Sequence, residues 1–267
     1  MRKIAVIGAG ALARIFCREV QNLLSEDYRV IAVMARNREH AEALADQCAA
    51  FACTDINDLL AGFPDLVVEF AGRDAVKAYA QPVLAHGSDL VIASIGALAD
   101  DEFRTNLFTL ARHSGRKVYI PNGAIGALDL MQTFALMGEA EVTISNTKAP
   151  RSLEGAPYLN GQSLPTDHKE VIFTGSVSDA INGFPKNVNV AVAAALASDT
   201  LDKATVKITS DPQSEENIHH IVLKNNLMRA ELTVAGKPDP ANPKSSTSTA
   251  WSVVALLKNL ASPVQFF

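Results

Sequence analysis

The stretch Lys3-Ile4-Ala5-Val6-Ile7-Gly8-Ala9-Gly10-Ala11-Leu12-Ala13 decides the fold at the start of this chain. Residues 3–7 form a continuous apolar run, which predicts a buried strand. Two glycines then interrupt the run, and apolar residues at helical spacing follow as far as residue 23. The stretch therefore predicts a strand, a tight turn and a helix in immediate succession.

The same alternation continues as far as residue 120. Apolar runs predict further strands at residues 30–34, 66–70, 90–94 and 117–120, and helices are predicted between them at 39–50, 75–85 and 101–114. Such alternation implies a parallel sheet, because each crossover needs a helix to return the chain. We expect an α/β domain over residues 1–120, with a doubly wound parallel sheet of the Rossmann type.

The pattern changes after Pro121. Strands are predicted at residues 142–145, 171–176, 204–209, 218–223 and 230–234, with one strongly apolar helix at 189–198. This pattern is typical of a mixed sheet covered by helices on one face, so residues 121–245 are predicted to form a second, α+β domain. The last apolar segment predicts a helix, and we expect residues 246–267 to pack back on the first domain.

The glycine turn matches the G-x-G-x-x-G/A fingerprint of dinucleotide binding. Gly8 permits the tight turn, Gly10 lets the backbone approach a pyrophosphate, and Ala13 allows close packing of helix and strand. Ala11 and Leu12 open the helix, whose N-terminus favours anions. A glycine turn with only a structural role is the alternative, but the strand-turn-helix context favours a dinucleotide cofactor, NAD or NADP.

Two arginines follow the second strand, in the sequence Met34-Ala35-Arg36-Asn37-Arg38. An acidic residue at this place binds the ribose 2′-hydroxyl of NAD, whereas a guanidinium suits the 2′-phosphate of NADP. We therefore expect Arg36 to contact the cofactor and NADP to be accepted at least as well as NAD. The alternative is that Arg36 and Arg38 are solvated charges at the start of a helix.

Composition excludes several other classes of function. The net charge of -5 and the pI near 5.7 give no electrostatic reason to expect nucleic acid or an anionic membrane as partner. No apolar run has the ~20 residues of a membrane span. Neither the three cysteines nor the histidines show metal-ligand spacing, so no metal site is expected. The charge leaves small molecules or proteins as partners, and the odd cysteine count and the lack of a leader favour a cytoplasmic protein.

Four later segments have unusual sequences that ordinary core packing does not explain, and they resemble segments of a known family. They are PNGAIGALD at residues 121–129, FPKNVNVA at 184–191, NIHHI at 217–221 and NPKSS at 242–246. Asn187 and Asn189 stand at the mouth of an apolar helix, where amides can cap the helix or bind a cofactor carboxamide. Together with GAGALA, VVEFAG and ASIGAL in the first domain, these segments resemble the L-aspartate dehydrogenase family.

The resemblance covers nearly the whole chain and implies a fold, a reaction and site residues. The family is similar in fold to dihydrodipicolinate reductase and homoserine dehydrogenase. Its reaction is the oxidative deamination of L-aspartate with NAD(P), which gives iminoaspartate and then oxaloacetate and ammonia, and iminoaspartate can feed NAD biosynthesis. By resemblance, His219 is the catalytic general base, Ala124 and Asn189 contact the nicotinamide, and the protein is a homodimer.

The substrate site is less well defined by the sequence. A dicarboxylate needs at least one cation, and Lys148, Lys244 and Ser245 lie in loops that resemble family motifs. The family's usual arginine before Lys148 is Thr147 here, and the serine of its PSGAIG loop is Asn122. Another dicarboxylic amino or keto acid is therefore an alternative substrate, and a non-catalytic nucleotide-sensing protein is an alternative function.

The neighbouring histidines His219 and His220 lie on a predicted strand. Successive side chains on a strand point to opposite faces, so only one of them can reach a site directly. A histidine with a pKa near the ordinary value of about 6.5 can act as a general base. The family's Asn-x-His register selects His219, although a structural histidine on a sheet is the alternative. Glu69, at the end of a strand, is open to a ligand-binding or a structural role.

Overall fold

The computed structural model describes residues 1–185, 188–237 and 246–266. The chain divides into two compact units, one of Met1–Pro121 with Thr249–Phe267 and the other of Asn122–Ser248. Lys244 and Ser245 lie outside the described residues. Each unit has its own sheet.

The first unit contains a six-stranded parallel sheet in the order β3-β2-β1-β4-β5-β6. This confirms the predicted doubly wound Rossmann sheet. Ligands bind such sheets where the strand order reverses, here between β1 and β4 at their carboxyl ends. The strands are β1 Arg2–Ile7, β2 Tyr28–Met34, β3 Phe51–Cys53, β4 Leu66–Glu69, β5 Asp89–Ile92 and β6 Val118–Tyr119.

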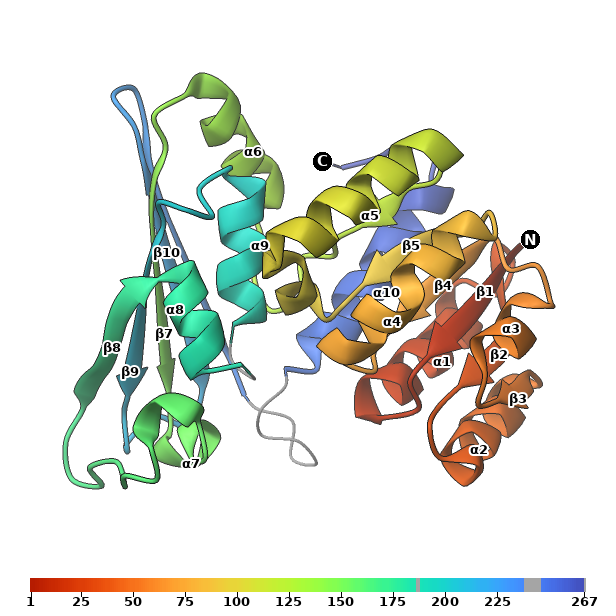
Figure 1. Ribbon diagram of the computed structural model, residues 1–267, viewed down its shortest axis with the longest axis horizontal. Helices are drawn as coiled ribbons and strands as arrows, with labels where there is room; N and C mark the ends of the chain where they lie inside the picture. The colour runs from red at the N-terminus through yellow and green to blue at the C-terminus, as the bar shows by residue number, and fades with distance from the viewer. Residues whose placement is uncertain (186–187, 238–245, 267) are drawn as a thin grey trace. The chain divides into compact units, whose positions relative to one another are not determined.

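Helices cover both faces of this sheet (Figure 1). One core joins α1, α2 and α10 to the sheet, with Phe16, Leu44 and Val253 packed around Ile4 and Val6 of β1. The inner strands are therefore buried on both faces, which explains their unbroken apolar runs. The helices of this unit are α1 Ala11–Leu23, α2 Arg38–Cys48, α3 Ile56–Leu60, α4 Arg73–Ala85, the 3-10 helix η1 Ile95–Ala99, α5 Asp101–Ser114 and α10 Ser248–Ala261.

Gly8 makes the turn between β1 and α1 possible. Its φ of +112° is one that residues with a Cβ rarely adopt. A Cβ at Gly8 would also lie 3.0 Å from the Phe70 carbonyl carbon and 3.1 Å from the Ala71 nitrogen. Gly10 differs, because its φ is -79° and a Cβ there would meet no atom within 4 Å. Gly8 is therefore needed by the fold, whereas Gly10 leaves open space above the turn.

Glu69 holds the neighbouring strand ends in place. It is buried, and its carboxylate accepts hydrogen bonds from the backbone N–H groups of Ala71 and Gly72 (both 2.6 Å) and of Ser94 (3.0 Å) and from the Ser94 hydroxyl (2.9 Å). Burial raises the pKa of Glu69, and these hydrogen bonds oppose that rise. Four donors fixing one carboxylate favour the structural role for Glu69.

The second unit contains a five-stranded mixed sheet in the order β11-β10-β7-β9-β8, in which only the β7–β9 pair is parallel. The predicted mixed sheet is confirmed. Figure 1 shows α6, α8 and α9 on one face of it. The elements are α6 Leu128–Met137, β7 Glu141–Lys148, α7 Pro150–Leu153, the 3-10 helix η2 Pro157–Leu159, β8 Glu170–Ser176, α8 Val177–Gly183, α9 Asn189–Ala197, β9 Thr205–Ser210, β10 Asn217–Lys224 and β11 Arg229–Gly236.

A membrane span would need a long apolar helix, and none of the helices in the described ranges meets that requirement.

Replacing Gly8 with alanine is expected to lower the free energy of unfolding by about 1–3 kcal/mol, because alanine is strained at this φ and its methyl group would press on the backbone of Phe70 and Ala71, just after β4. Urea unfolding followed by circular dichroism measures the loss. Gly10→Ala is the matched control, and it should lose about 1 kcal/mol or less, the usual cost of a poorer helix cap. Equal stability of Gly8→Ala and the wild-type protein would contradict this account of the turn.

Candidate active site

The candidate cofactor site of the first unit begins at the N-terminus of α1. Gly10 occupies the N-cap position without a side-chain hydrogen bond, so no side chain of its own caps the first turn. Ala13 is fully buried between helix and sheet, while Ala11 and Leu12 are half-buried in the first turn. The open space above Gly10 would be filled by a Cβ in most other residues. This cradle of backbone N–H groups fits the pyrophosphate of a dinucleotide.

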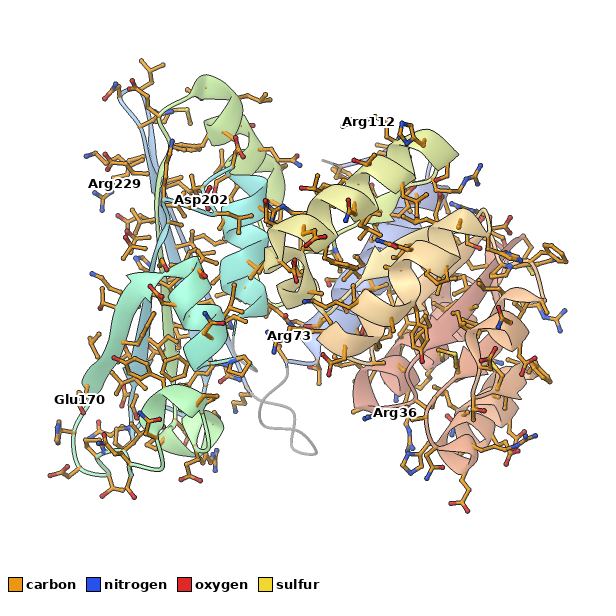
Figure 2. All side chains as sticks on the ribbon, in the orientation of Figure 1. Arg36, Arg73, Arg112, Glu170, Asp202 and Arg229 are labelled. Atoms are coloured by element: carbon orange, nitrogen blue, oxygen red, sulfur yellow. The ribbon has the colours of Figure 1, made fainter. Side chains whose placement is uncertain are left out.

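A cavity of about 370 Å³ lies beside the carboxyl ends of β1 and β2, and its lining includes Ile7, Ala35 and Tyr79. Arg36, after β2, and Arg73, at the start of α4, both line it, as does the carboxylate residue Asp74. Figure 2 shows the two arginines on these separate elements. The cavity fits the adenosine end of a dinucleotide, and it brings two cations to a ligand that carries phosphates.

The structure separates the two arginines that follow β2. Arg38 is the first residue of α2, and its guanidinium donates a hydrogen bond to the Glu42 carboxylate at 2.8 Å. It does not line the cavity. Arg73 was not predicted as a site residue. The one sequence feature that could have indicated it is its position at the start of the helix after β4. Arg36 and Arg73, rather than Arg36 and Arg38, are the pair of cations at this pocket.

The second unit holds a candidate site of its own, on the helix-covered face of its sheet. His219 of β10 stands opposite Asn146 of the adjacent strand β7, and both side chains are buried. The His219 Nδ1 lies 2.6 Å from the Asn146 Oδ1. A carbonyl oxygen only accepts, so Nδ1 carries the proton and donates it to Asn146. In neutral His219, Nε2 is then left with its lone pair, the form that a general base needs.

Burial and a nearby cation keep His219 neutral. Its pKa falls from 6.5 to about 3, first because burial disfavours the imidazolium and second because the Lys148 ammonium repels it. The ordinary histidine pKa of about 6.5 therefore does not apply to His219. The 5% exposure behind this shift arises from tertiary packing, which the sequence does not show.

Lys148 is the unusual charge of this face. It ends β7, its side chain is only 4% exposed, and burial alone lowers its pKa to about 8. Lysines are almost never buried without a partner. Within the described ranges of the chain, the ion pairs include none between Lys148 and a carboxylate. An uncompensated buried cation favours binding of an anion at this place.

His220 points to the other face of the sheet. Its Nδ1 lies 2.8 Å from the Thr233 hydroxyl, and its Nε2 lies 3.8 Å from the Glu231 carboxylate. Both partners belong to β11. The two histidines therefore occupy opposite faces and contact different residues, as strand alternation requires. His220 has the surroundings of a surface histidine with cross-strand partners.

The residues expected beside the nicotinamide lie elsewhere in the second unit. Ala124 is half-buried in the turn before α6. Asn189 is the first residue of α9 and is exposed, and α9 packs against β7, the strand of Asn146 and Lys148. Val188 occupies the N-cap position of α9 without a side-chain hydrogen bond, and Asn187 lies outside the described residues. The nicotinamide contacts of Ala124 and Asn189 stay predictions.

The described part of the chain contains no group of three His, Cys, Asp or Glu side chains that could hold a metal ion.

Comparisons with known proteins extend over the whole chain. Residues 8–121 match the family described as "Homoserine dehydrogenase, NAD binding domain", and residues 129–260 match "Aspartate dehydrogenase, C-terminal". An L-aspartate dehydrogenase of Methanococcus maripaludis is 37% identical, with 99% of each chain covered. The chain belongs to the L-aspartate dehydrogenase family. A second member of the family, from Methanocaldococcus jannaschii, is 35% identical over 99% of each chain.

Solved structures agree with this assignment. The crystal structure of aspartate dehydrogenase from Thermotoga maritima is similar over the full length of both chains, with a TM-score of 0.76 and 25% sequence identity. A homoserine dehydrogenase from Thiobacillus denitrificans has a TM-score of 0.61 at 15% identity, with 97% of this chain and 73% of that chain covered, and it shows the shared fold alone. Together with the family match to an NAD-binding domain, these likenesses support a nicotinamide cofactor.

Replacing Lys148 with methionine is expected to stabilise the protein at neutral pH. The native pKa of about 8 lies below the ordinary value of 10.5, a difference worth about 3 kcal/mol. The unfolded state binds the proton more tightly, so the destabilisation is complete below pH 8 and disappears as the pH rises above 10.5. Lys148→Met should gain up to about 3 kcal/mol in urea unfolding at neutral pH, and the gain should shrink in alkaline buffer.

Lys207→Met is the matched control, because Lys207 is an exposed lysine on the neighbouring strand β9. It should leave the unfolding free energy within about 0.5 kcal/mol of wild type. A Lys148→Met protein that is less stable than wild type at neutral pH would show that the buried ammonium is compensated after all.

Proposed function

We propose that this protein catalyses the NAD(P)-dependent oxidative deamination of L-aspartate, which gives iminoaspartate and then oxaloacetate and ammonia. The observation that carries the proposal is the buried His219–Asn146 pair with Lys148 close enough to lower the histidine pKa. The full-length similarity to proteins named L-aspartate dehydrogenase supports the choice of substrate. An aspartate dehydrogenase needs a base and a cation for a dicarboxylate, and this sheet face offers both.

Proton transfer is the task of His219 in this reaction. The bound dinucleotide supplies the hydride acceptor. Hydride can leave the aspartate Cα only when the nitrogen lone pair can form the C=N bond, so the ammonium must first lose a proton. Water must later add to the imine carbon, and it too must lose a proton. The His219 Nε2, which neutral His219 presents with a free lone pair, serves one or both steps as general base.

The negative charge of the substrate raises the low pKa of His219, so that the histidine can act as a base. A group with a pKa of about 3 is a weak base at neutral pH. A carboxylate bound at Lys148 offsets the ammonium charge and adds a negative charge beside the imidazole, and both effects raise the histidine pKa. The substrate therefore restores the basicity that its own reaction needs. His219 gains its proton affinity only when the site is filled.

The first unit is proposed to bind NADP at least as well as NAD. The glycine cradle of α1 would hold the pyrophosphate through backbone N–H groups. Arg36 would meet the 2′-phosphate, because it lines the cavity beside the end of β2, where the adenosine ribose binds in this fold. Arg73 would add a second cation for the phosphates of either cofactor, and Asp74 in the same lining reduces the net charge. These arginines support acceptance of NADP without requiring rejection of NAD.

The catalytic role is tested by the paired variants His219→Ala and His220→Ala. Formation of reduced nicotinamide with L-aspartate is expected to fall about 10²- to 10⁴-fold in kcat for His219→Ala, the usual contribution of a general base. His220→Ala should keep kcat within a few-fold, because His220 contacts only β11 partners on the other face. Thermal unfolding of both variants checks that the loss is not one of folding.

Two results would reject the proposal. One is a wild-type protein that turns over neither L-aspartate nor oxaloacetate with ammonia, and the other is an inactive His220→Ala beside an active His219→Ala.

Cofactor selection is tested by binding, with Arg36→Gln compared with Arg38→Gln. Fluorescence titration of each reduced cofactor should show that Arg36→Gln weakens NADPH by about tenfold or more, since it loses a charged hydrogen bond worth about 1.5–3 kcal/mol, and leaves NADH nearly unchanged. Arg38→Gln should alter neither, because Arg38 is paired with Glu42 outside the cavity. Equal losses for both cofactors in Arg36→Gln would place Arg36 away from the 2′-phosphate.

A further inference from the structure

Ser210 is a buried hydroxyl that no part of the proposed mechanism uses. It ends β9 and has no exposed surface, and its Oγ has no hydrogen-bond partner among the described residues. An unpartnered buried hydroxyl destabilises the folded state, because it loses its hydrogen bonds to water without replacing them. Such groups are rare in folded proteins, so each one needs a reason.

The register of the sheet places Ser210 beside Lys148. The two residues are partners across the parallel strands β7 and β9. Paired residues in adjacent strands point to the same face, with strands about 4.8 Å apart. Lys148 and Asn146 are two positions apart on β7 and so share that face, and His219 stands opposite Asn146. One end of the covered face therefore gathers these four side chains.

A second donor of this group also lacks a partner. The Asn146 Oδ1 accepts from His219, but its buried Nδ2 has no partner in the described part of the chain. The Asn146 amide, the Ser210 hydroxyl and the Lys148 ammonium thus present hydrogen-bond donors to one place. The ammonium and the amide N–H₂ can only donate. Their ligand must accept several hydrogen bonds and carry negative charge.

A carboxylate meets these requirements. It accepts up to about four hydrogen bonds through two oxygens and balances one ammonium. A neutral ligand would leave the Lys148 charge uncompensated, and a cation would add to it. Among the described residues, no ion pair joins a carboxylate to Lys148, and Asp211, which follows Ser210, pairs with Lys169 at 3.5 Å.

We propose that Ser210, together with the Asn146 amide and the Lys148 ammonium, binds one carboxylate of a dicarboxylate substrate next to His219. The identification of the substrate as a dicarboxylate rests on the proposed function, whereas the assignment of Ser210 rests on the sheet register and its unpartnered hydroxyl. Asn146 then has two roles. Its oxygen fixes the histidine tautomer, and its nitrogen holds the substrate beside that histidine.

Ser210→Ala tests the assignment by direct binding of succinate, a four-carbon dicarboxylate that cannot react. Isothermal titration of the full-length protein, with and without oxidised dinucleotide, should show succinate binding weakened by about tenfold or more, as expected for a lost hydrogen bond to a charged group. The stability of Ser210→Ala should match or exceed that of wild type, because the deleted hydroxyl has no partner among the described residues.

Thr209→Val is the matched control. Thr209 is also buried, but it neighbours Ser210 on the same strand and so points to the opposite face. It should leave succinate affinity within about twofold of wild type, less than 0.5 kcal/mol. Ser198→Ala is a second control for buried serines, because its hydroxyl donates to the Ala194 carbonyl at 2.7 Å, and its loss should lower stability without changing affinity.

The outcomes separate this inference from the proposed function. Unchanged succinate affinity in Ser210→Ala, or no succinate binding by wild type, would overturn the role of Ser210 even if L-aspartate is oxidised. A protein that binds succinate through Ser210 but does not oxidise L-aspartate would keep the carboxylate site and reject the reaction. A loss of affinity as large in Thr209→Val as in Ser210→Ala would also overturn the assignment, since it would show an effect of strand β9 as a whole.

Discussion

The buried ammonium of Lys148 is the constraint on which the rest of the candidate substrate site depends. A cation in an apolar interior is costly unless it is paired, and the described residues offer it no carboxylate. Burial first, and the charge of this ammonium second, lower the pKa of His219 and so keep the imidazole neutral. The same charge can be satisfied by a carboxylate from outside the chain. One lysine therefore links the protonation state of the base to the charge of the ligand.

The register of the sheet places Lys148 near His219, the proposed base. Asn146 and Lys148 share a face of β7. Asn146 is paired with His219 on β10, and Lys148 is paired with Ser210 on β9. The other end of the same face is apolar, with Ile144, Val206 and Leu223 buried. A polar end and an apolar end on one face allow the strands to pack under α6, α8 and α9 while keeping donors for a ligand (Figure 1). A slip of one residue would exchange His219 for His220.

Local signals made the two sheets and the glycine cradle predictable, because strand periodicity, helix spacing and the Gly8–Gly10 turn lie within short segments. The short strand β3 and the helix α3 gave no such signal and were missed. Strand alternation separated His219 from His220, but choosing between them needed the family resemblance. The sequence did not predict the roles of three further residues. Those of Asn146 and Ser210 arise from pairing between strands that are distant in sequence, and that of Arg73 arises from a shared cavity. The lowered pKa of His219 could not be predicted from the sequence for the same reason, because it depends on burial.

Because the charge of the ligand alters the basicity of His219, specificity for a dicarboxylate substrate should act on the chemical step as well as on binding. An enzyme discriminates through interactions that differ between ground state and transition state. A monocarboxylate bound elsewhere would leave the Lys148 ammonium uncompensated, and the nearby His219 would stay a weak base. A dicarboxylate that fills the donor set raises the basicity of His219 just when a proton must be removed. Under the proposed mechanism, the second carboxylate therefore contributes to the rate of the chemical step as well as to affinity, because the charge that holds the substrate is also the charge that adds to burial in lowering the histidine pKa.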